Sequence, residues 1–407
     1  MKCGLLGRML GHSYSPQIHA RLGDYSYELF EKEPEDLENF LKNGDFSGIN
    51  VTVPYKKAVI PYLDELSPLA QKLGAVNTVV RRGGKLIGHN TDYFGFLTMV
   101  RSSGLQVSGK KVLVLGSGGA SNTAVAVLTE LGATVVIISR SGENNYGNLH
   151  LHADAAVIIN TTPVGTYPNT DEAPLSLDSF PRLEGVLDVI YNPARTMLLR
   201  QAQERGLTTC NGLLMLVAQA KEASEWFTGR DIPDEKIIEI HRVLRQQMEN
   251  IILIGMPGCG KSTVGKALAE KLGKTFADTD ETIVSLAGKS IPEIFAQDGE
   301  AVFRDWETKA LSQQAKQSGL VIATGGGCVT RKVNHSILRQ NGSLFWLQRE
   351  LDMLPTDGRP LSQSNRLEDL YRVRKPLYED FSDHVIGNNG GLDDAIHQIL
   401  AIWEGEK

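Results

Sequence analysis

Short apolar runs alternate with amphipathic stretches along most of the chain. Residues 111–115 and 134–138 are apolar at nearly every position over a strand length, which indicates strands buried on both faces. Residues 120–131 and 260–272 instead repeat their apolar positions every three to four residues, as helices do. This alternation predicts an α/β fold with parallel sheets. The expected strands are 2–6, 48–53, 111–115, 134–138, 156–160, 185–189, 251–255, 320–323 and 343–347.

A predicted helix at 233–248 marks where the chain divides. Pro233 and the two acidic residues after it are typical of a helix start, and the apolar face runs through Met248. A strand follows at 251 without a Gly/Ser-rich or Pro-rich linker, so independent tumbling of the two halves is not expected. At about 150 residues per domain, the 407 residues make two or three compact units. We expect the division at 248/249.

Composition narrows the class of protein. Apolar residues make up 41% of the chain, which is ordinary for a globular protein, and no apolar run approaches the ~20 residues that span a bilayer. The formal net charge of -6 argues against nucleic acid or an acidic membrane as partner, so small molecules are expected instead. The start lacks the apolar core of a secretory signal, and the four cysteines are far apart. We expect a cytoplasmic protein; its oligomeric state is open.

A P-loop opens the second half. Residues 255–262 fit GxxxxGK[ST], follow an apolar strand and begin a helix, which is the context that this motif requires. The backbone N–H groups of such a loop converge on phosphates, Lys261 reaches the β/γ oxygens, and Ser262 can ligate Mg²⁺. The expected ATP-binding residues are Gly258, Cys259, Gly260, Lys261, Ser262 and Thr263.

Further charged residues and a glycine triplet follow the P-loop in a distinctive order. A kinase for a small anionic alcohol needs cations for the carboxylate and an acid for the hydroxyl. Each residue alone would more often be a surface charge or a structural ion pair. Together, over 249–407, they resemble the shikimate kinase family. The residues that carry the resemblance are Asp278, Asp280, Arg304, Gly325, Gly326, Gly327, Arg359 and Arg374.

The resemblance implies a kinase that uses Mg²⁺ and ATP on shikimate. It implies that Asp280 orients the attacking hydroxyl, and that Arg304 and Arg374 hold the carboxylate near the backbone of Gly325, Gly326 and Gly327. Asp278 would hold Mg²⁺ through water. Arg359 would belong to the lid over ATP, although residues 351–361 are few for the lid of this family.

A second nucleotide-binding turn lies in the first half. Residues 111–121 combine a strand, a glycine turn and a helix start, which suits a dinucleotide pyrophosphate, although Ser121 replaces the usual third glycine. The next strand ends near Arg140 without an acid for a ribose 2′-hydroxyl, and Arg140 can pair with a 2′-phosphate. NADP is therefore favoured over NAD. The expected contacts are Gly116, Ser117, Gly118, Gly119, Ala120, Ser121 and Arg140.

The candidate chemistry precedes this turn. Hydride reduction of a ketone needs a proton donor, and Lys56 paired with Asp92 can supply one. Alone, either residue would most often be structural or exposed. The motifs around them, at 50–56, 74–78 and 88–95, together with 10–19, 188–193 and 212–220, resemble shikimate dehydrogenase from Met1 to about Arg245.

This resemblance implies a two-lobed reductase with a Rossmann-like NADP lobe at about 101–211 and a substrate lobe at about 1–100 plus 212–248. It implies that Lys56 is the acid/base at the C3 oxygen, oriented by Asp92, and that Gly212 lies near the nicotinamide. Ser13, Ser15 and Tyr191 would hold the substrate carboxylate. Its hydroxyls would be met by Thr52, Asn77, Asp92 and Gln219.

The connection at 141–155 is short for a crossover between parallel strands, so it need not contain a helix. His150, His152 and Asp154 alternate there, but a solvated loop is expected rather than a metal site.

The combined hypothesis is a bifunctional enzyme of chorismate and aromatic amino acid biosynthesis. It would reduce 3-dehydroshikimate with NADPH and then phosphorylate the 3-hydroxyl of shikimate with ATP, using a P-loop, nucleoside-monophosphate-kinase-like domain. Two alternatives stay open: a non-catalytic or sensing first half beside an active kinase, and a dehydrogenase that also accepts quinate or NAD.

Overall fold

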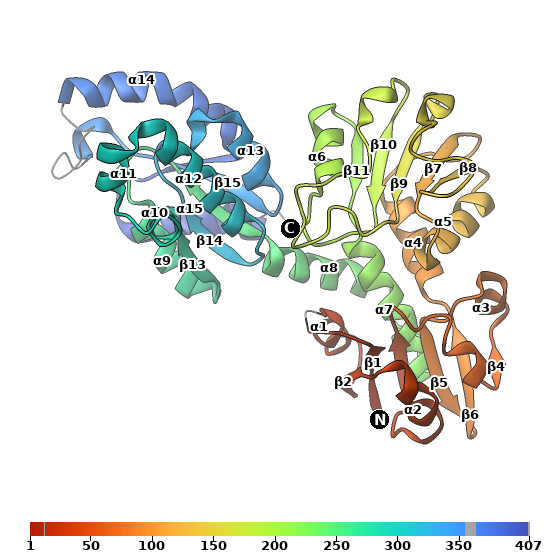
Figure 1. The fold of residues 1–407 in the computed structure, drawn as a ribbon. Helices are drawn as coiled ribbons and strands as arrows, with labels where there is room; N and C mark the ends of the chain where they lie inside the picture. Colours follow the sequence, from red (N-terminus) through yellow and green to blue (C-terminus); the bar gives the residue numbers. More distant parts are fainter. Residues whose placement is uncertain (12, 355–363, 406–407) are drawn as a thin grey trace. The chain divides into compact units, whose positions relative to one another are not determined.

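A computed structural model describes residues 1–11, 13–354 and 364–405 (Figure 1). The chain forms two compact units: Met1–Thr166, Asp171–Tyr191 and Thr196–Val243 make unit 1, and Tyr167–Thr170, Asn192–Arg195 and Leu244–Lys407 make unit 2. The change of unit falls inside α8 (Glu235–Met248). Lys274 helps to tie the end of this helix to unit 2, because its ammonium donates to the carbonyl oxygens of Gln246, Gln247 and Glu249 at 2.9, 3.1 and 2.8 Å.

The first lobe of unit 1 contains a six-stranded mixed sheet in the order β2-β1-β3-β5-β6-β4. The expectation of parallel sheets is wrong for this lobe, because β5 pairs antiparallel with both β3 and β6. Helix α7 packs on the sheet, where the ring of Phe227 lies against Gly48. The elements are β1 Lys2–Gly7, α1 Ser15–His19, β2 Ser26–Glu31, α2 Leu37–Asn43, β3 Gly48–Val51, β4 Glu65–Leu66, α3 Pro68–Leu73, β5 Thr78–Arg82, β6 Lys85–His89 and α7 Leu213–Thr228.

The second lobe of unit 1 has a five-stranded parallel sheet in the order β11-β10-β9-β7-β8. Strand β7 is buried on both faces: Val112 and Val114 pack with α4 and α5, while Leu113 and Leu115 pack with α6. This explains its continuous apolar sequence. The elements are α4 Asp92–Ser102, β7 Lys111–Leu115, α5 Gly119–Glu130, β8 Thr134–Ile138, β9 Val157–Asn160, β10 Gly185–Asp188, α6 Met197–Glu204 and β11 Thr208–Cys210.

Unit 2 is built on a parallel sheet in the order β13-β14-β12-β15-β16, with helices on both faces (Figure 1). Strand β12 lies at the centre with all five residues buried, and it leads directly into the P-loop. The elements are β12 Asn250–Ile254, α9 Lys261–Leu272, β13 Thr275–Asp278, α10 Thr279–Ala287, α11 Ile291–Gln297, α12 Gly299–Ala315, β14 Leu320–Ala323, α13 Lys332–Arg339, β15 Gly342–Gln348, α14 Ser364–Phe381, β16 His384–Gly387 and α15 Leu392–Gly405.

The expected α/β fold class is confirmed, and each expected strand is present to within two residues at its ends. The connection after β8 contains one short 3-10 helix, Leu149–His152, as its length allowed. Across the described residues, no helix combines the length and apolar character needed to cross a membrane.

Candidate active sites

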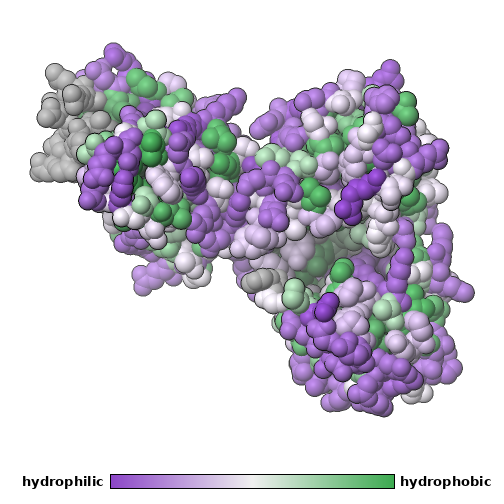
Figure 2. All heavy atoms as spheres, in the orientation of Figure 1, coloured by the Kyte–Doolittle hydropathy of each residue, from purple (hydrophilic) through white to green (hydrophobic). Residues whose placement is uncertain are grey.

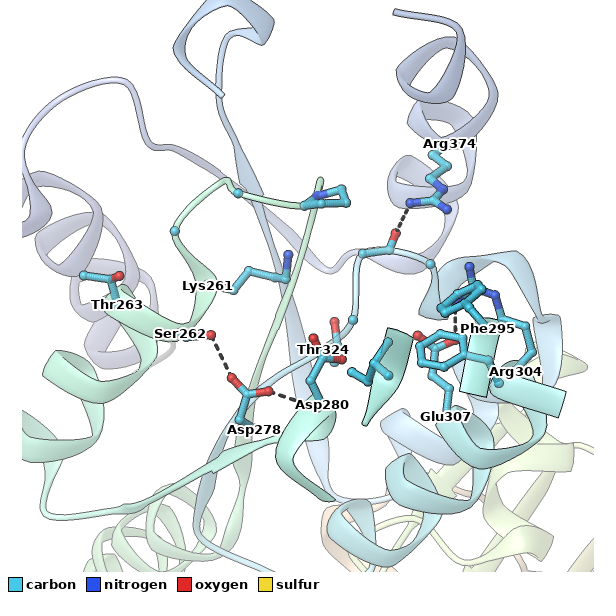
Figure 3. Close-up of a pocket in the computed structure, with 18 of the residues that line it drawn as sticks. Lys261, Ser262, Thr263, Asp278, Asp280, Phe295, Arg304, Glu307, Thr324 and Arg374 are labelled. Carbon is cyan, nitrogen blue, oxygen red and sulfur yellow. Dashed lines mark hydrogen bonds and ion pairs between the residues drawn. The ribbon is translucent and has the colours of Figure 1, made fainter. Parts of the chain in front are cut away.

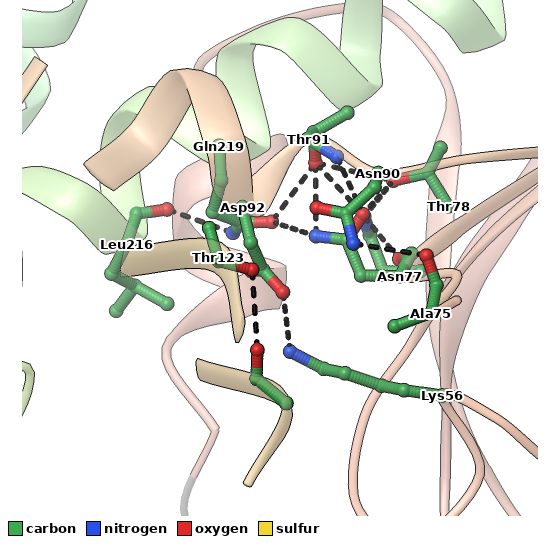
Figure 4. Close-up of polar contacts among 12 residues, drawn as sticks. Lys56, Ala75, Asn77, Thr78, Asn90, Thr91, Asp92, Thr123, Leu216 and Gln219 are labelled. Atoms are coloured by element: carbon green, nitrogen blue, oxygen red, sulfur yellow. Dashed lines mark hydrogen bonds and ion pairs between the residues drawn. The ribbon is translucent and has the colours of Figure 1, made fainter. Parts of the chain in front are cut away.

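An ion pair occupies the centre of the first candidate site. Lys56 follows β3, and Asp92 is the first residue of α4. The Lys56 ammonium donates to Oδ2 of Asp92 at 2.6 Å, with side-chain exposures of 27% and 12% (Figure 4). Both residues therefore remain accessible to a ligand while each fixes the other. The predicted proton donor and its predicted partner are brought together.

Lys56 and Asp92 line a cavity of about 270 Å³ whose walls are formed by residues from both lobes of unit 1. Figure 2 shows the surface hollowed between these lobes. Every residue expected at the reductase substrate lines this cavity. From the cofactor set, Ala120 and Gly212 also do. The lining residues are Leu5, Ser13, Ser15, Asn50, Val51, Thr52, Lys56, Asn77, Asp92, Ala120, Val189, Tyr191, Gly212, Met215, Leu216 and Gln219.

Hydrogen bonds hold the amide groups of this cavity in defined orientations (Figure 4). Oδ1 of Asn77 accepts from the backbone N–H of Thr91 at 2.7 Å, and its Nδ2 donates to Oγ1 of Thr91 at 3.0 Å. Gln219, on α7, donates to the Leu216 carbonyl at 2.8 Å, and its Oε1 accepts from Nδ2 of Asn77 at 3.4 Å. These hydrogen bonds hold the Asn77 and Gln219 amides in orientations in which they can bind hydroxyl groups of a ligand.

Hydroxyl groups lie elsewhere along the same cavity. Oγ of Ser13 accepts from the backbone N–H of Ser15 at 3.2 Å. Ser13 lies in the turn just before α1, and Ser15 is the first residue of that helix. The sequence prediction missed Asn50, which is 5% exposed and accepts from the Tyr27 hydroxyl at 2.8 Å. Its place as the first residue of the 50–56 motif was the available signal.

Asp188 fixes the strand end that leads to Tyr191. Its carboxylate accepts from the Thr196 hydroxyl at 2.7 Å, the Ile190 N–H at 3.0 Å and the Asn160 amide at 3.1 Å. Burial raises the pKa of Asp188 to about 7, although these three donors act in the opposite direction. The fully buried group is therefore a source of pH dependence in stability.

Acidification is expected to stabilise the wild type relative to an Asp188→Asn variant. Below a pH of about 7 the folded state takes up a proton at Asp188, whereas the unfolded state, with the ordinary pKa of 3.8, does not. As the pH is lowered from about 7.5 to about 5, the unfolding free energy of the wild type should rise by about 2–3 kcal/mol relative to that of Asp188→Asn. Urea unfolding measures this, with the reductase transition identified by its shift on adding NADP⁺. Asp24 is exposed, so Asp24→Asn serves as the control and should follow the wild type at every pH. If the unfolding free energies of the wild type and Asp188→Asn differ by the same amount at every pH, the raised pKa of Asp188 is contradicted.

The glycine turn fits a dinucleotide. Gly116 has φ +111°, a conformation that side chains disfavour, and a Cβ there would lie 2.9 Å from Oγ1 of Thr161. A Cβ on Gly118 or Gly119 would meet nothing within 4 Å, and no side chain caps α5. Backbone and space are thus available to a pyrophosphate at this helix N-terminus. Ser117 belongs to the same turn, Ser121 is fully buried in α5, and Arg140 is exposed just beyond β8.

His152 and Asp154 of the short connection make structural contacts. A ring nitrogen of His152 lies 2.9 Å from Oδ1 of Asn144, and Asp154 pairs with Lys111 at 2.7 Å. In the part of the chain that the structure describes, no cluster of three or more His, Cys, Asp or Glu side chains is arranged to hold a metal ion.

The second candidate site is a cavity of about 550 Å³ at the carboxyl edge of the unit 2 sheet (Figure 3). Gly258 and Gly260 have φ of +84° and +97°, which lets the loop curl around the start of α9. Lys261 is 8% exposed and donates to the carbonyl oxygens of Gly255 and Met256 at 2.9 and 3.0 Å. The Lys261 ammonium therefore lies beside the curved backbone of the P-loop, whose N–H groups are suited to bind phosphate.

Two oxygen ligands lie together at the start of α9. The Ser262 hydroxyl donates to Oδ2 of Asp278 at 2.7 Å, and Oδ1 of Asp278 accepts from the Asp280 backbone N–H at 2.9 Å (Figure 3). Hydroxyl and carboxylate oxygens are ligands that Mg²⁺ accepts. Ser262 and Asp278 thus fit the predicted metal position, and Asp280 lines the same cavity.

Arginines lie on the other side of this cavity. Arg304 on α12 pairs with the fully buried Glu307 at 2.8 Å and with Glu300 at 3.0 Å. Arg374 on α14 donates to the Gly326 carbonyl at 3.1 Å (Figure 3). Burial raises the pKa of Glu307 against the opposing effect of Arg304. Two guanidinium groups are thereby held near the Gly325–Gly327 backbone, an arrangement suited to a carboxylate.

Most residues expected in the kinase site line this cavity, including Thr263. Cys259 does not: it is fully buried, and its Sγ lies 3.8 Å from the Lys261 ammonium. Arg359 lies outside the described residues. The sequence prediction missed several lining residues, of which Glu307 was signalled by its spacing of three from Arg304 on a helix. The missed residues are Pro257, Ile291, Phe295, Phe303, Glu307, Thr324 and Arg349.

Comparisons with known proteins match both halves of the chain. The family model "Shikimate dehydrogenase substrate binding domain" matches residues 5–79, and "Shikimate kinase" matches 257–403. A shikimate dehydrogenase (NADP⁺) from Clostridium perfringens strain 13 is 36% identical over 265 residues, which cover 60% of this chain and 97% of the relative.

Two solved structures extend the match to the fold. Shikimate dehydrogenase 1 from Peptoclostridium difficile is 36% identical with a TM-score of 0.56, covering 60% of this chain and 97% of that one. Shikimate 5-dehydrogenase from Thermus thermophilus, in complex with NADP(H) and shikimate, is 32% identical with a TM-score of 0.54, covering 60% and 99%.

Proposed function

Because this chain belongs to the shikimate dehydrogenase family and carries a shikimate kinase domain behind it, we propose that it catalyses two consecutive reactions. Residues 1–248 would reduce 3-dehydroshikimate to shikimate with NADPH, and residues 249–407 would transfer the γ-phosphoryl group of ATP to the 3-hydroxyl of shikimate. The observation that carries this proposal is that each half gathers nucleotide-binding residues and groups suited to a carboxylated, hydroxylated ring in one cavity.

In the reductase half, the chain binds the ring and manages one proton. NADPH, when bound along the 116–121 turn with Arg140 near its 2′-phosphate, supplies the hydride. Ser13, Ser15 and Tyr191 bind the carboxylate, and the ordered amides of Asn77 and Gln219 bind hydroxyls. Lys56 donates its proton to the carbonyl oxygen as that oxygen gains charge, and Asp92 holds the ammonium in place at 2.6 Å.

In the kinase half, the chain positions two anions against each other. Ser262 and Asp278 would hold Mg²⁺, which would neutralise phosphate charge. Lys261 and the P-loop N–H groups bind the phosphates of ATP. Arg304 and Arg374 bind the shikimate carboxylate, which leaves Asp280 to orient the 3-hydroxyl for attack and accept its hydrogen bond.

A coupled assay of the full chain tests both steps. With 3-dehydroshikimate, ATP and Mg²⁺, ADP release should require NADPH, whereas added shikimate should restore it without NADPH. If ADP is released with 3-dehydroshikimate, ATP and Mg²⁺ in the absence of NADPH, the proposed order of the two reactions is contradicted. A silent NADPH signal beside shikimate-driven ADP release would instead support a non-catalytic first half.

A further inference from the structure

Arg349 is a basic residue of the kinase cavity to which neither the sequence motifs nor the family resemblance gives a role. It follows β15 directly and lines the cavity together with Gly258, Gly260 and Lys261. Its Nε is buried without a hydrogen-bond partner, and its side chain forms no ion pair with any residue in the described ranges. The side chain as a whole is half-buried and lines the cavity, so its terminal guanidinium nitrogens are the atoms placed to meet an external acceptor.

The sheet order places Arg349 on the nucleotide side of the cavity. Along the carboxyl edge, the strands that precede Asp280 and Gly325–Gly327 lie on one side of the P-loop strand β12, and β15 lies on the other. Neighbouring strands are about 5 Å apart, and Ile254 pairs with Trp346. Arg349 therefore starts one strand away from the P-loop, opposite the residues proposed to bind shikimate.

The loop after β16 braces this side of the cavity. The Asn388 amide donates to the Cys259 carbonyl in the P-loop at 2.6 Å, and the Asn388 N–H donates to the Gln348 carbonyl at 2.8 Å. The next residue, Asn389, accepts from the Glu350 N–H at 2.9 Å. The residues on both sides of Arg349 are thus fixed relative to the P-loop, which limits where the guanidinium can reach.

The other basic side chains among the described residues that line the cavity are already engaged. Arg304 pairs with Glu300 and Glu307, Arg374 donates to Gly326, and Lys261 donates to two carbonyl oxygens. Resting on the kinase reaction proposed above, we propose that Arg349 binds the phosphate chain of ATP. It would thereby supply, from a fixed strand end, a positive charge beside the P-loop.

Replacing Arg349 by Gln in the full chain is expected to raise KM for ATP and weaken binding of tripolyphosphate by about 10- to 100-fold, the effect of losing one charge-assisted hydrogen bond. KM for shikimate and affinity for adenosine should change less than about twofold, since neither meets this charge. Arg349→Lys should recover part of the loss. Arg372→Gln removes an exposed arginine of α14, with side-chain exposure of 80%, and serves as the matched control.

Shikimate KM and adenosine affinity report that the kinase unit of each variant is folded, and NADPH oxidation reports the same for unit 1. Unchanged ATP KM and tripolyphosphate affinity in Arg349→Gln would overturn the proposal. So would an equal loss of adenosine binding, which would assign the residue to the base, or a change confined to shikimate KM. If even the wild type releases no ADP, the kinase function fails, while tripolyphosphate binding still tests Arg349.

Discussion

Replacing Lys56 by alanine is expected to lower NADPH oxidation by about 10³-fold while shikimate-driven ADP release persists. The ammonium lies 2.6 Å from Asp92, and it is the only basic side chain among the described residues that line the reductase cavity. Without it, no other lysine or arginine among the described lining residues can neutralise the alkoxide that develops on the substrate. Following NADPH absorbance and ADP release in parallel measures both effects on one preparation.

The adjacent lysine provides the matched control for this experiment. Lys57 is exposed and does not line the cavity, so Lys57→Ala should retain both activities. Retained NADPH oxidation in the Lys56 variant would refute its acid/base role. Loss of both activities in that variant would point to misfolding of the whole chain, which an intact ADP signal excludes.

Replacing Lys261 by alanine is expected to have the opposite result, lowering kinase turnover by about 10²- to 10³-fold with NADPH oxidation unchanged. Lys261 is buried at the start of α9 and already faces oxygen atoms of its own loop, so phosphate oxygens can replace these acceptors without moving the helix. The removed charge is one that stabilises the transferring phosphoryl group. Initial rates of ADP formation with saturating shikimate measure the loss.

Lys271 lies on the same helix and is exposed, so Lys271→Ala should leave kinase turnover unchanged. Equal rates for the Lys261 variant and the wild type would remove the P-loop lysine from the mechanism. Because the two predictions use opposite reporters, a general loss of folding cannot imitate either of them.

Strands with a continuous apolar sequence could be predicted, whereas strands interrupted by charged residues could not. Strand β7 is apolar throughout because both of its faces are covered, and its predicted limits are confirmed. Strands β5 and β6 are each buried at three of their five positions, but Arg81, Arg82 and Lys85 interrupt them, so no apolar run of strand length marks them. Their signal was the turn instead: Gly83 and Gly84 have φ of +56° and +81°, which a two-residue hairpin requires.

The candidate sites divide along a similar line. Residues within short motifs, such as Lys261 and Ser262, could be placed because strand, loop and helix are contiguous there. Arg349 could not, because its approach to the P-loop depends on the pairing of β15 with β12, whose partner residues, such as Asn250 and Gly342, are 92 positions apart. The roles of the motif residues remain predictions that the variants above test.

The anchoring of α8 by Lys274 has a practical consequence for anyone who separates the two activities. A cut at 248/249 would remove two of the three carbonyl acceptors of a lysine that is largely buried and whose pKa burial lowers to about 8. It would also take away the Met248 carbonyl, which accepts from the Gly319 N–H at 2.7 Å. A kinase fragment should therefore keep Leu244–Met248, and this C-terminal part of α8 is better regarded as the start of the kinase than as a spacer.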